Sequence, residues 1–179
     1  MNLFLRLMLL FIRAQFSSKK EALVKPYKLT FRVWLTDQDM FMHMTNSRYL
    51  SFSDLGTINF IIRSGSMKQL NKNGWYPVIC GQTMSVSRML KTPQAFVVTS
   101  QIMGWTEKYV GIRHTFERKG KVHAEVNVIA RFASRDRKPV TPQQMVDAVN
   151  WTGETPELPE LYLDLIDRVE AGRAEISKS

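Results

Sequence analysis

The sequence predicts an α+β domain in which an antiparallel sheet wraps around one buried helix. Apolar side chains recur at helical spacing over residues 46–63 and become nearly continuous toward the end of that run. Four strand-like runs follow, and the short connections between them predict that consecutive strands are antiparallel neighbours. These runs cover residues 76–90, 95–105, 109–118 and 121–133.

The first elements of the domain are indicated by alternation and by end signals. Residues 27–35 alternate apolar and polar side chains, which is typical of a half-buried strand, and residues 36–45 are predicted to be a loop. Thr45 can serve as the N-cap of the long helix, and Gly65 can end it.

The later elements follow from similar signals. A short helix is expected over residues 66–73, and Lys119-Gly120 indicates a tight hairpin. Two more helices are expected, at residues 141–149 beside Pro142 and at residues 158–171, the second acidic and exposed. We therefore divide the chain into three parts. They are an N-terminal helix and linker (1–25), the main domain (26–140) and a helical extension (141–179).

Composition limits the class of protein. A chain of 179 residues, 44% hydrophobic and 23% charged, fits one globular domain with short extensions. Its single cysteine excludes an internal disulfide, which favours a reducing, cytoplasmic compartment. Cys80 follows Val78 and Ile79, so we interpret it as a buried small residue rather than a nucleophile.

The net charge of +9 favours an anionic binding partner. A nucleotide-bearing thioester, an anionic lipid surface or a nucleic acid would each fit. The basic residues are scattered and are not clustered with stacking aromatics, so we expect no nucleic acid partner.

Residues 1–15 are strongly apolar but too short to span a bilayer comfortably, and Arg6 interrupts them. On a helix the polar residues of this segment form one narrow stripe, as in a helix that lies at a membrane interface. The alternative, a helix packed on the domain or on a partner subunit, carries equal weight, although Lys19 and Lys20 slightly favour an anionic surface. The stripe comprises Asn2, Arg6, Arg13 and Ser17.

The most informative segment lies between the first strand and the long helix. It places two carboxylates, an imidazole, a carboxamide and a phenol within thirteen residues, beside a helix N-terminus whose free N–H groups favour negative charge. Such a junction predicts acyl transfer or hydrolysis. The residues are Asp37, Asp39, His43, Asn46 and Tyr49.

This segment resembles the signature of hotdog-fold acyl-CoA thioesterases of the 4-hydroxybenzoyl-CoA type, roughly D-x-D-x-x-G-H-x-N-N-x-x-Y, over residues 27–133. Asp54 falls where the following helix of that family has an acidic residue, while Met42 replaces the usual Gly and Thr45 the first Asn. The resemblance implies a hotdog fold, acyl-CoA hydrolysis and assembly into homodimers or tetramers, with no cofactor.

Asp39 is the candidate nucleophile or general base. We expect Met40 and Phe41 to desolvate it and so to raise its basicity. The alternative is an aspartate that caps the N–H groups of its own loop, which is the commoner use of this residue. The motif match favours the catalytic role, and Asp37 is interpreted as the residue that holds the loop.

The start of the long helix supplies the candidate oxyanion site. The backbone N–H of Asn46 and those after it would meet the thioester oxygen. His43 either orients Asp39 or is structural, and Tyr49 either packs in the core or reaches the substrate. Asp54 points either to the site or to a subunit interface.

Substrate contacts are predicted at three further residues. A Gly at position 42 would allow positive φ, which Met does not adopt cheaply. The loop therefore takes another path, or the oxyanion site is looser, or Met42 lines an acyl pocket. Arg88 and Lys91 are candidates for the phosphates of coenzyme A, with Arg135, Arg137 and Lys138 as a second set.

No metal is predicted, because His114 and His123 lack the spacing of metal ligands. Two functions remain in competition. The first is an acyl-CoA thioesterase. The alternative is a non-catalytic acyl- or lipid-binding hotdog module, held peripherally at a membrane surface by residues 1–15.

Overall fold

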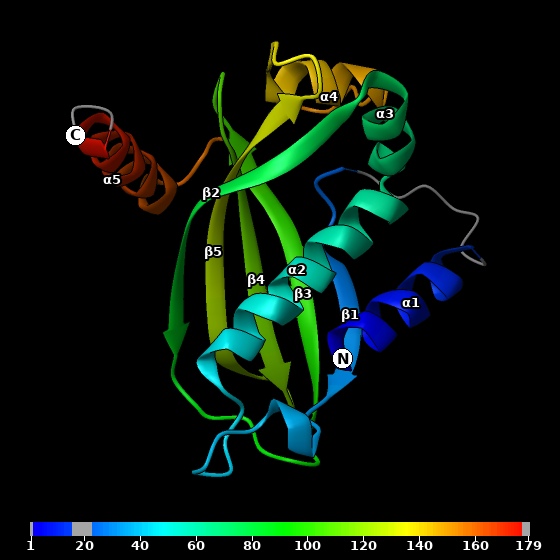
Figure 1. Cartoon of the computed structure of the whole chain (residues 1–179), viewed down its shortest axis with the longest axis vertical. Coiled ribbons are helices and arrows are strands. Elements are labelled where there is room, and N and C mark those ends of the chain that lie inside the picture. The colour runs from blue at the N-terminus through cyan, green and yellow to red at the C-terminus, as the bar shows by residue number, and fades with distance from the viewer. Residues whose placement is uncertain (1, 16–22, 177–179) are drawn as a thin grey trace.

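A computed structural model describes residues 2–15 and 23–176 as a curved antiparallel sheet wrapped around one long helix (Figure 1). A 3₁₀ turn, η1, covers Leu35–Asp37. The helices are α1 (Asn2–Gln15), α2 (Asn46–Arg63), α3 (Ser66–Asn73), α4 (Pro142–Ala148) and α5 (Glu160–Ile176). The strands are β1 (Tyr27–Arg32), β2 (Trp75–Val86), β3 (Ala95–Trp105), β4 (Val110–Arg118), β5 (Lys121–Ser134) and β6 (Pro139–Val140).

Local sequence signals predicted the first and last residues of several helices and strands correctly. The helices α2 and α3 and the strand β3 begin and end where expected. Thr45 is the N-cap residue of α2, although its side chain makes no capping bond and lies instead 3.1 Å from the Ser47 hydroxyl. Ser64 is the C-cap, and Gly65 follows with a φ of 80°, a left-handed conformation that ends the helix at little steric cost.

The prediction that β2 and β3 are neighbours in the sheet is wrong. The sheet order is β1-β3-β4-β5-β2, with β6 also paired to β5, so β2 lies at the edge opposite to β1. Residues 87–94 therefore cross one end of the sheet instead of turning back (Figure 1). The N–H groups of Ser87 and Arg88 both donate to the His123 carbonyl, at 2.9 and 3.0 Å, and so hold the crossing segment against the start of β5.

The helix α2 fills the concave face of the sheet. Aromatic rings join the two layers: Phe52 meets Phe96 edge-on at 5.1 Å between ring centroids, and Tyr49 meets Phe116 at 5.2 Å. Gly56 permits this close approach, because a Cβ there would lie 2.3 Å from the Ser100 hydroxyl. The core between the first half of α2 and the sheet is therefore aromatic and tightly packed.

The helix α5 covers the opposite face of the sheet, which corrects its predicted exposure. Successive residues of a strand point to opposite faces, and Ile129 of β5 packs with Tyr162 and Leu165 of α5. The Tyr162 hydroxyl also donates to the Asn127 side chain at 2.7 Å. One face of α5 is thus buried, and most of its acidic residues are exposed.

The helix α1 packs beside α2 and β1 (Figure 1), with Arg6 turned inward. Arg6 is only 10% exposed and binds the Asp37 carboxylate at 2.7 Å, so this member of the polar stripe faces the domain, as in the packed-helix alternative. A buried carboxylate requires a counter-charge, which explains the inward direction of Arg6. Over residues 4–12, where the side chains of α1 are described, the exposed residues are apolar. They are Phe4, Leu5, Met8, Leu9, Phe11 and Ile12.

Membrane contact through this segment stays a prediction. One face of α1 packs on the domain, and the opposite face is exposed. Ser17, Lys19 and Lys20, with most of the predicted linker, lie outside the described residues. Within the described ranges 2–15 and 23–176, the helices fall short of the length and apolar character needed to cross a membrane.

Candidate functional site

The motif segment forms a closed turn around Asp39. Gln38 and Met44 pair as an isolated antiparallel bridge, and the Asp39 N–H donates to the His43 carbonyl at 2.9 Å. The Asp39 carboxylate oxygen Oδ1 accepts the N–H groups of Phe41 (2.9 Å) and His43 (3.2 Å). Asp39 therefore caps its own loop, as the alternative interpretation expected, and its catalytic role stays a prediction.

The tip of this turn is apolar and exposed. Met40, Phe41 and Met42 are 87%, 71% and 59% exposed, and Asp39 beside them is exposed as well. The expected desolvation of Asp39 by these side chains is therefore absent within one chain. An exposed cluster of three large apolar side chains indicates a surface that another molecule covers.

Met42 keeps the backbone conformation that glycine would favour. Its φ is 63°, in the left-handed region, and its carbonyl accepts a hydrogen bond from the Gln38 side chain at 2.5 Å. The alternative of a different loop path is therefore not needed. The methionine adopts the strained conformation at a cost of about 1–2 kcal/mol.

Asp37 holds the base of the turn, as predicted. Its side chain is fully buried and pairs with Arg6 at 2.7 Å and with Arg48 at 3.5 Å. It also accepts the Trp34 N–H at 2.9 Å. This set of donors compensates the desolvation of the carboxylate and fixes η1, the turn and the start of α2 relative to one another.

Asn46 and Tyr49 begin α2 but face different surroundings. Asn46 is the first residue of the helix and is exposed, so its N–H lies at a free helix N-terminus. Tyr49 is fully buried, and its hydroxyl accepts the Leu90 N–H at 3.3 Å. Burial raises the pKa of Tyr49, so the phenol stays protonated. Its substrate contact remains a prediction, while its packing role is evident.

The segment between β2 and β3 lies beside the motif turn. The Met44 N–H donates to the Leu90 carbonyl at 2.7 Å, and the exposed residues Arg88 and Lys91 lie within two residues of Leu90 in the sequence. The second set of candidate cations is elsewhere. Arg135 directly follows β5, at the end remote from His123, and its N–H donates to the Gly74 carbonyl.

A cavity of about 240 Å³ lies between α2 and the sheet, and sequence reasoning missed it. Its walls are almost entirely apolar, and Asp54 is the one acidic residue among those that line it. Burial raises the pKa of the Asp54 carboxyl. The spacing of Asp54, Thr57, Ile58 and Ile61 along one helix face was the available signal. The opposing wall comes from four strands and could not be assigned in advance.

A buried polar network stands behind this cavity. His114 is fully buried, with Nδ1 2.8 Å from the Ser100 hydroxyl and Nε2 3.4 Å from the Thr57 hydroxyl. Burial lowers the pKa of His114 to about 4, so the ring is neutral at pH 7. Thr57 lines the cavity and thus connects it to the network. In the described part of the chain, acidic, histidine and cysteine side chains form no group of three that could hold a metal.

Comparison with known proteins identifies the family. A profile of the thioesterase-like superfamily matches residues 33–161, and the chain belongs to this superfamily. Protein THEM6 of Xenopus laevis is 26% identical over 113 residues, which is 63% of this chain and 55% of that protein. The chain thus spans about half the length of this relative.

Solved structures show the same fold. YbaW, a probable thioesterase from Escherichia coli, matches with a TM-score of 0.64 at 16% identity, over 71% of this chain and 98% of YbaW. SAV2348 of Staphylococcus aureus, solved in complex with CoA, matches with a TM-score of 0.62 at 16% identity, over 80% and 94% of the two chains. The hotdog fold and the family predicted from the motif are confirmed.

Proposed function

We propose that this chain hydrolyses acyl-CoA thioesters to a free acid and CoA. Membership of the thioesterase-like superfamily supports thioester hydrolysis in general. The observation that carries the proposal is the apolar cavity between α2 and the sheet, with the partly desolvated Asp54 carboxyl in its lining. An apolar cavity with one convergent carboxyl suits an acyl chain whose activated carbonyl stays near the mouth.

In this proposal Asp39 supplies the nucleophile or the general base. Its carboxylate attacks the thioester carbonyl, the C–S bond breaks, CoA leaves as a thiolate that takes a proton from water, and a second water hydrolyses the anhydride. As a general base, Asp39 would instead take a proton from the attacking water. The two N–H groups that bind Oδ1 fix the orientation of the carboxylate.

The remaining predicted residues keep their proposed roles. The N-terminal N–H groups of α2, beginning at Asn46, would stabilise the oxyanion, and His43 would orient Asp39. Met42 would contact the acyl group, and Arg88 and Lys91 would meet the CoA phosphates. The position of Arg88 and Lys91 beside the Met44–Leu90 contact supports this, as does the CoA bound to the Staphylococcus aureus neighbour.

Asp54 is a second candidate for the reacting carboxylate. Asp39 is exposed in one chain and lies outside the cavity lining, whereas Asp54 is within that lining. If a second copy of the chain covers the Asp39 turn, both carboxyl groups could face one substrate, as expected for a site completed by a homodimer. The two carboxylates are distinguishable by substitution.

The test measures release of CoA thiol from acyl-CoAs of increasing chain length. We expect Asp39→Asn to lower kcat/KM by at least about 10²-fold, because the reacting group is lost. Asp54→Asn is measured beside it, and the exposed Asp164→Asn on α5 is the matched control. If Asp39→Asn keeps full activity while Asp54→Asn loses it, the catalytic role moves to Asp54. The absence of hydrolysis for every acyl-CoA would refute the proposed function.

A further inference from the structure

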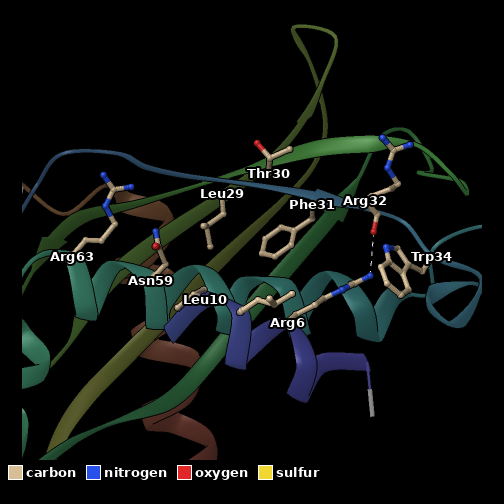
Figure 2. A pocket seen from close by; sticks show the side chains of 10 residues that line it. Arg6, Leu10, Leu29, Thr30, Phe31, Arg32, Trp34, Asn59 and Arg63 are labelled. Carbon is tan, nitrogen blue, oxygen red and sulfur yellow. Dashed lines mark hydrogen bonds between the residues drawn. The ribbon is translucent and has the colours of Figure 1, made fainter. Parts of the chain in front are cut away.

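A second hollow of about 470 Å³ lies on the other side of α2, between α1, β1 and α2 (Figure 2). Its volume is within the range of small-molecule sites. Leu9 and Leu10 of α1 face Leu29 and Phe31 of β1 across it, and α2 contributes Asn59 and Arg63. It shares no lining residue with the cavity that contains Asp54. We call it the α1–β1 groove.

Arg6 closes one end of the groove. Its guanidinium donates to the Arg32 carbonyl at 3.2 Å, the bond drawn in Figure 2, and its charge is balanced by Asp37. Toward the other end Figure 2 shows Asn59 and Arg63 side by side on α2. The Arg63 guanidinium lies 5.6 Å from the centroid of the Tyr27 ring, which holds it near the groove.

Asn59 contributes a buried hydrogen-bond donor without a protein acceptor. The residue is 5% exposed, and its Nδ2 is buried with no hydrogen-bond partner among the described residues. Leaving such a donor unsatisfied costs about 1–3 kcal/mol, so polar groups of this kind usually have a partner. An acceptor oxygen of a ligand in the groove would supply it.

The charge of the lining selects an anion. Three of the ten lining residues are arginines and none is acidic. The bond from the Arg32 side chain goes to the neutral Pro93 carbonyl at 2.8 Å, which leaves its positive charge for the groove mouth. The remaining walls are mainly aliphatic and aromatic. The preferred ligand therefore combines a small anionic head with an aliphatic chain.

We propose that the α1–β1 groove binds a long-chain carboxylate, a fatty acid anion. The carboxylate accepts hydrogen bonds from Asn59 Nδ2 and the Arg63 guanidinium, and the chain lies between the leucines of α1 and the apolar side chains of β1. This site is separate from the proposed catalytic cavity and goes beyond the hydrolytic function. Binding of a fatty acid anion in the α1–β1 groove does not depend on whether the chain hydrolyses thioesters.

Calorimetric titration of the full chain with dodecanoate, below its micellar concentration, tests the proposal. We expect saturable binding of dodecanoate and at least tenfold weaker binding of dodecanol and of acetate, which lack the charge and the chain respectively. Equal affinity for dodecanol and dodecanoate would overturn the choice of an anion. Equal affinity for acetate would overturn the choice of a lipid.

Two filling variants locate the site. Leu29→Trp places a large side chain in the α1–β1 groove, and Ile58→Trp places the same side chain in the cavity that contains Asp54. We expect dodecanoate binding to fall at least tenfold in Leu29→Trp and to persist in Ile58→Trp. The reverse pattern would place the ligand in the α2–sheet cavity and refute the groove.

A charge reversal keeps the test valid if Leu29→Trp fails to fold. Arg63→Glu reverses the charge at the end of the groove where the carboxylate is proposed to bind, and Lys28→Glu reverses an exposed charge of β1 that does not line the groove. We expect Arg63→Glu to weaken dodecanoate binding at least tenfold and Lys28→Glu to leave it within about twofold. Equal weakening by both would show a general effect of charge and would overturn the proposal.

Discussion

Met42 occupies a backbone conformation that its residue type disfavours. Its φ of 63° costs about 1–2 kcal/mol for a residue with a Cβ, whereas glycine adds about 0.5–1 kcal/mol of entropy to the unfolded chain. We therefore expect Met42→Gly to stabilise the protein by up to about 1 kcal/mol. Chemical denaturation measures the change. Met40→Gly is the control, since Met40 is also exposed at the turn but has no positive φ, and it should destabilise. If the Met42→Gly protein is less stable than the Met40→Gly protein, the backbone at Met42 is not strained.

His114 makes stability depend on pH. Its folded pKa of about 4 lies below the ordinary 6.5, so the unfolded state binds the proton more readily between these values. The contribution is fully present above pH 6.5 and is lost as pH falls toward 4, by about 3 kcal/mol in all at ~1.4 kcal/mol for each pH unit. Urea unfolding of the wild type and of His114→Gln at pH 7, 5.5 and 4.5 measures this. The variant should be less stable than the wild type at pH 7, but its free energy of unfolding should change less with pH. If the free energy of unfolding changes equally with pH in both proteins, His114 is not the cause of the pH dependence.

At the residue scale, the sequence predicted the roles that depend on neighbours along the chain. Asp37 holds the turn in part by accepting the N–H of Trp34, three residues earlier, and Thr45 directly precedes α2 as its N-cap residue. The place of Asp54 was not predictable. It depends on β2, β3, β4 and β5, whose side chains complete the cavity only after the sheet has curved around α2.

At the element scale, the buried pair of Arg6 and Asp37 attaches α1 to the domain. Arg6→Met keeps much of the side-chain stem and removes the closer of two arginines paired with Asp37, while Arg48 stays at 3.5 Å. Removing one member of a buried pair typically costs about 3–5 kcal/mol, and the remaining arginine should reduce this to about 2 kcal/mol. We also expect faster hydrogen exchange in α1 than in α2.

A double-mutant cycle with Asp37→Asn separates the pair from other effects of each change. The coupling energy should be about 1 kcal/mol or more, because the two groups are in direct contact. Additive effects of the two substitutions would mean that α1 is held by Leu10 and its other apolar contacts rather than by this pair.

The first and last residues of the helices and strands were easier to predict than which strands are neighbours in the sheet. The helix α3 lies between Gly65 and Gly74, which both have positive φ, and these glycines indicated its ends in advance. The placement of β2 beside β5 has no comparable local signal. It depends on a crossing segment held by the His123 carbonyl, more than thirty residues further along the chain. The inward direction of Arg6 likewise depends on Asp37, which is distant in sequence.

At the scale of the whole molecule, two exposed features indicate a second copy of the chain. The strand β2 forms one edge of the sheet, so its outer N–H and C=O groups have no strand partner in the described chain. Tyr76 and Ile79 on this edge strand are exposed, as are the three apolar residues at the tip of the Asp39 turn. A pairing of two copies that buried both features would enlarge the sheet and cover the proposed catalytic carboxylate.

We therefore expect a homodimer, measured as the molar mass in solution by light scattering after size-exclusion chromatography. Phe41→Ser removes a ring that is 71% exposed at the turn, so it should leave the fold of the single chain intact and raise the dimer dissociation constant at least about tenfold, as for loss of a buried aromatic anchor. Leu161→Ser, at an exposed apolar residue of α5, is the matched control and should leave the mass unchanged.

If Phe41→Ser weakens the dimer, it should also lower the rate of hydrolysis at low protein concentration, because the partner copy covers Asp39. The rate should recover at high protein concentration. A fully active monomer would separate catalysis from assembly and would favour Asp54 as the reacting carboxylate.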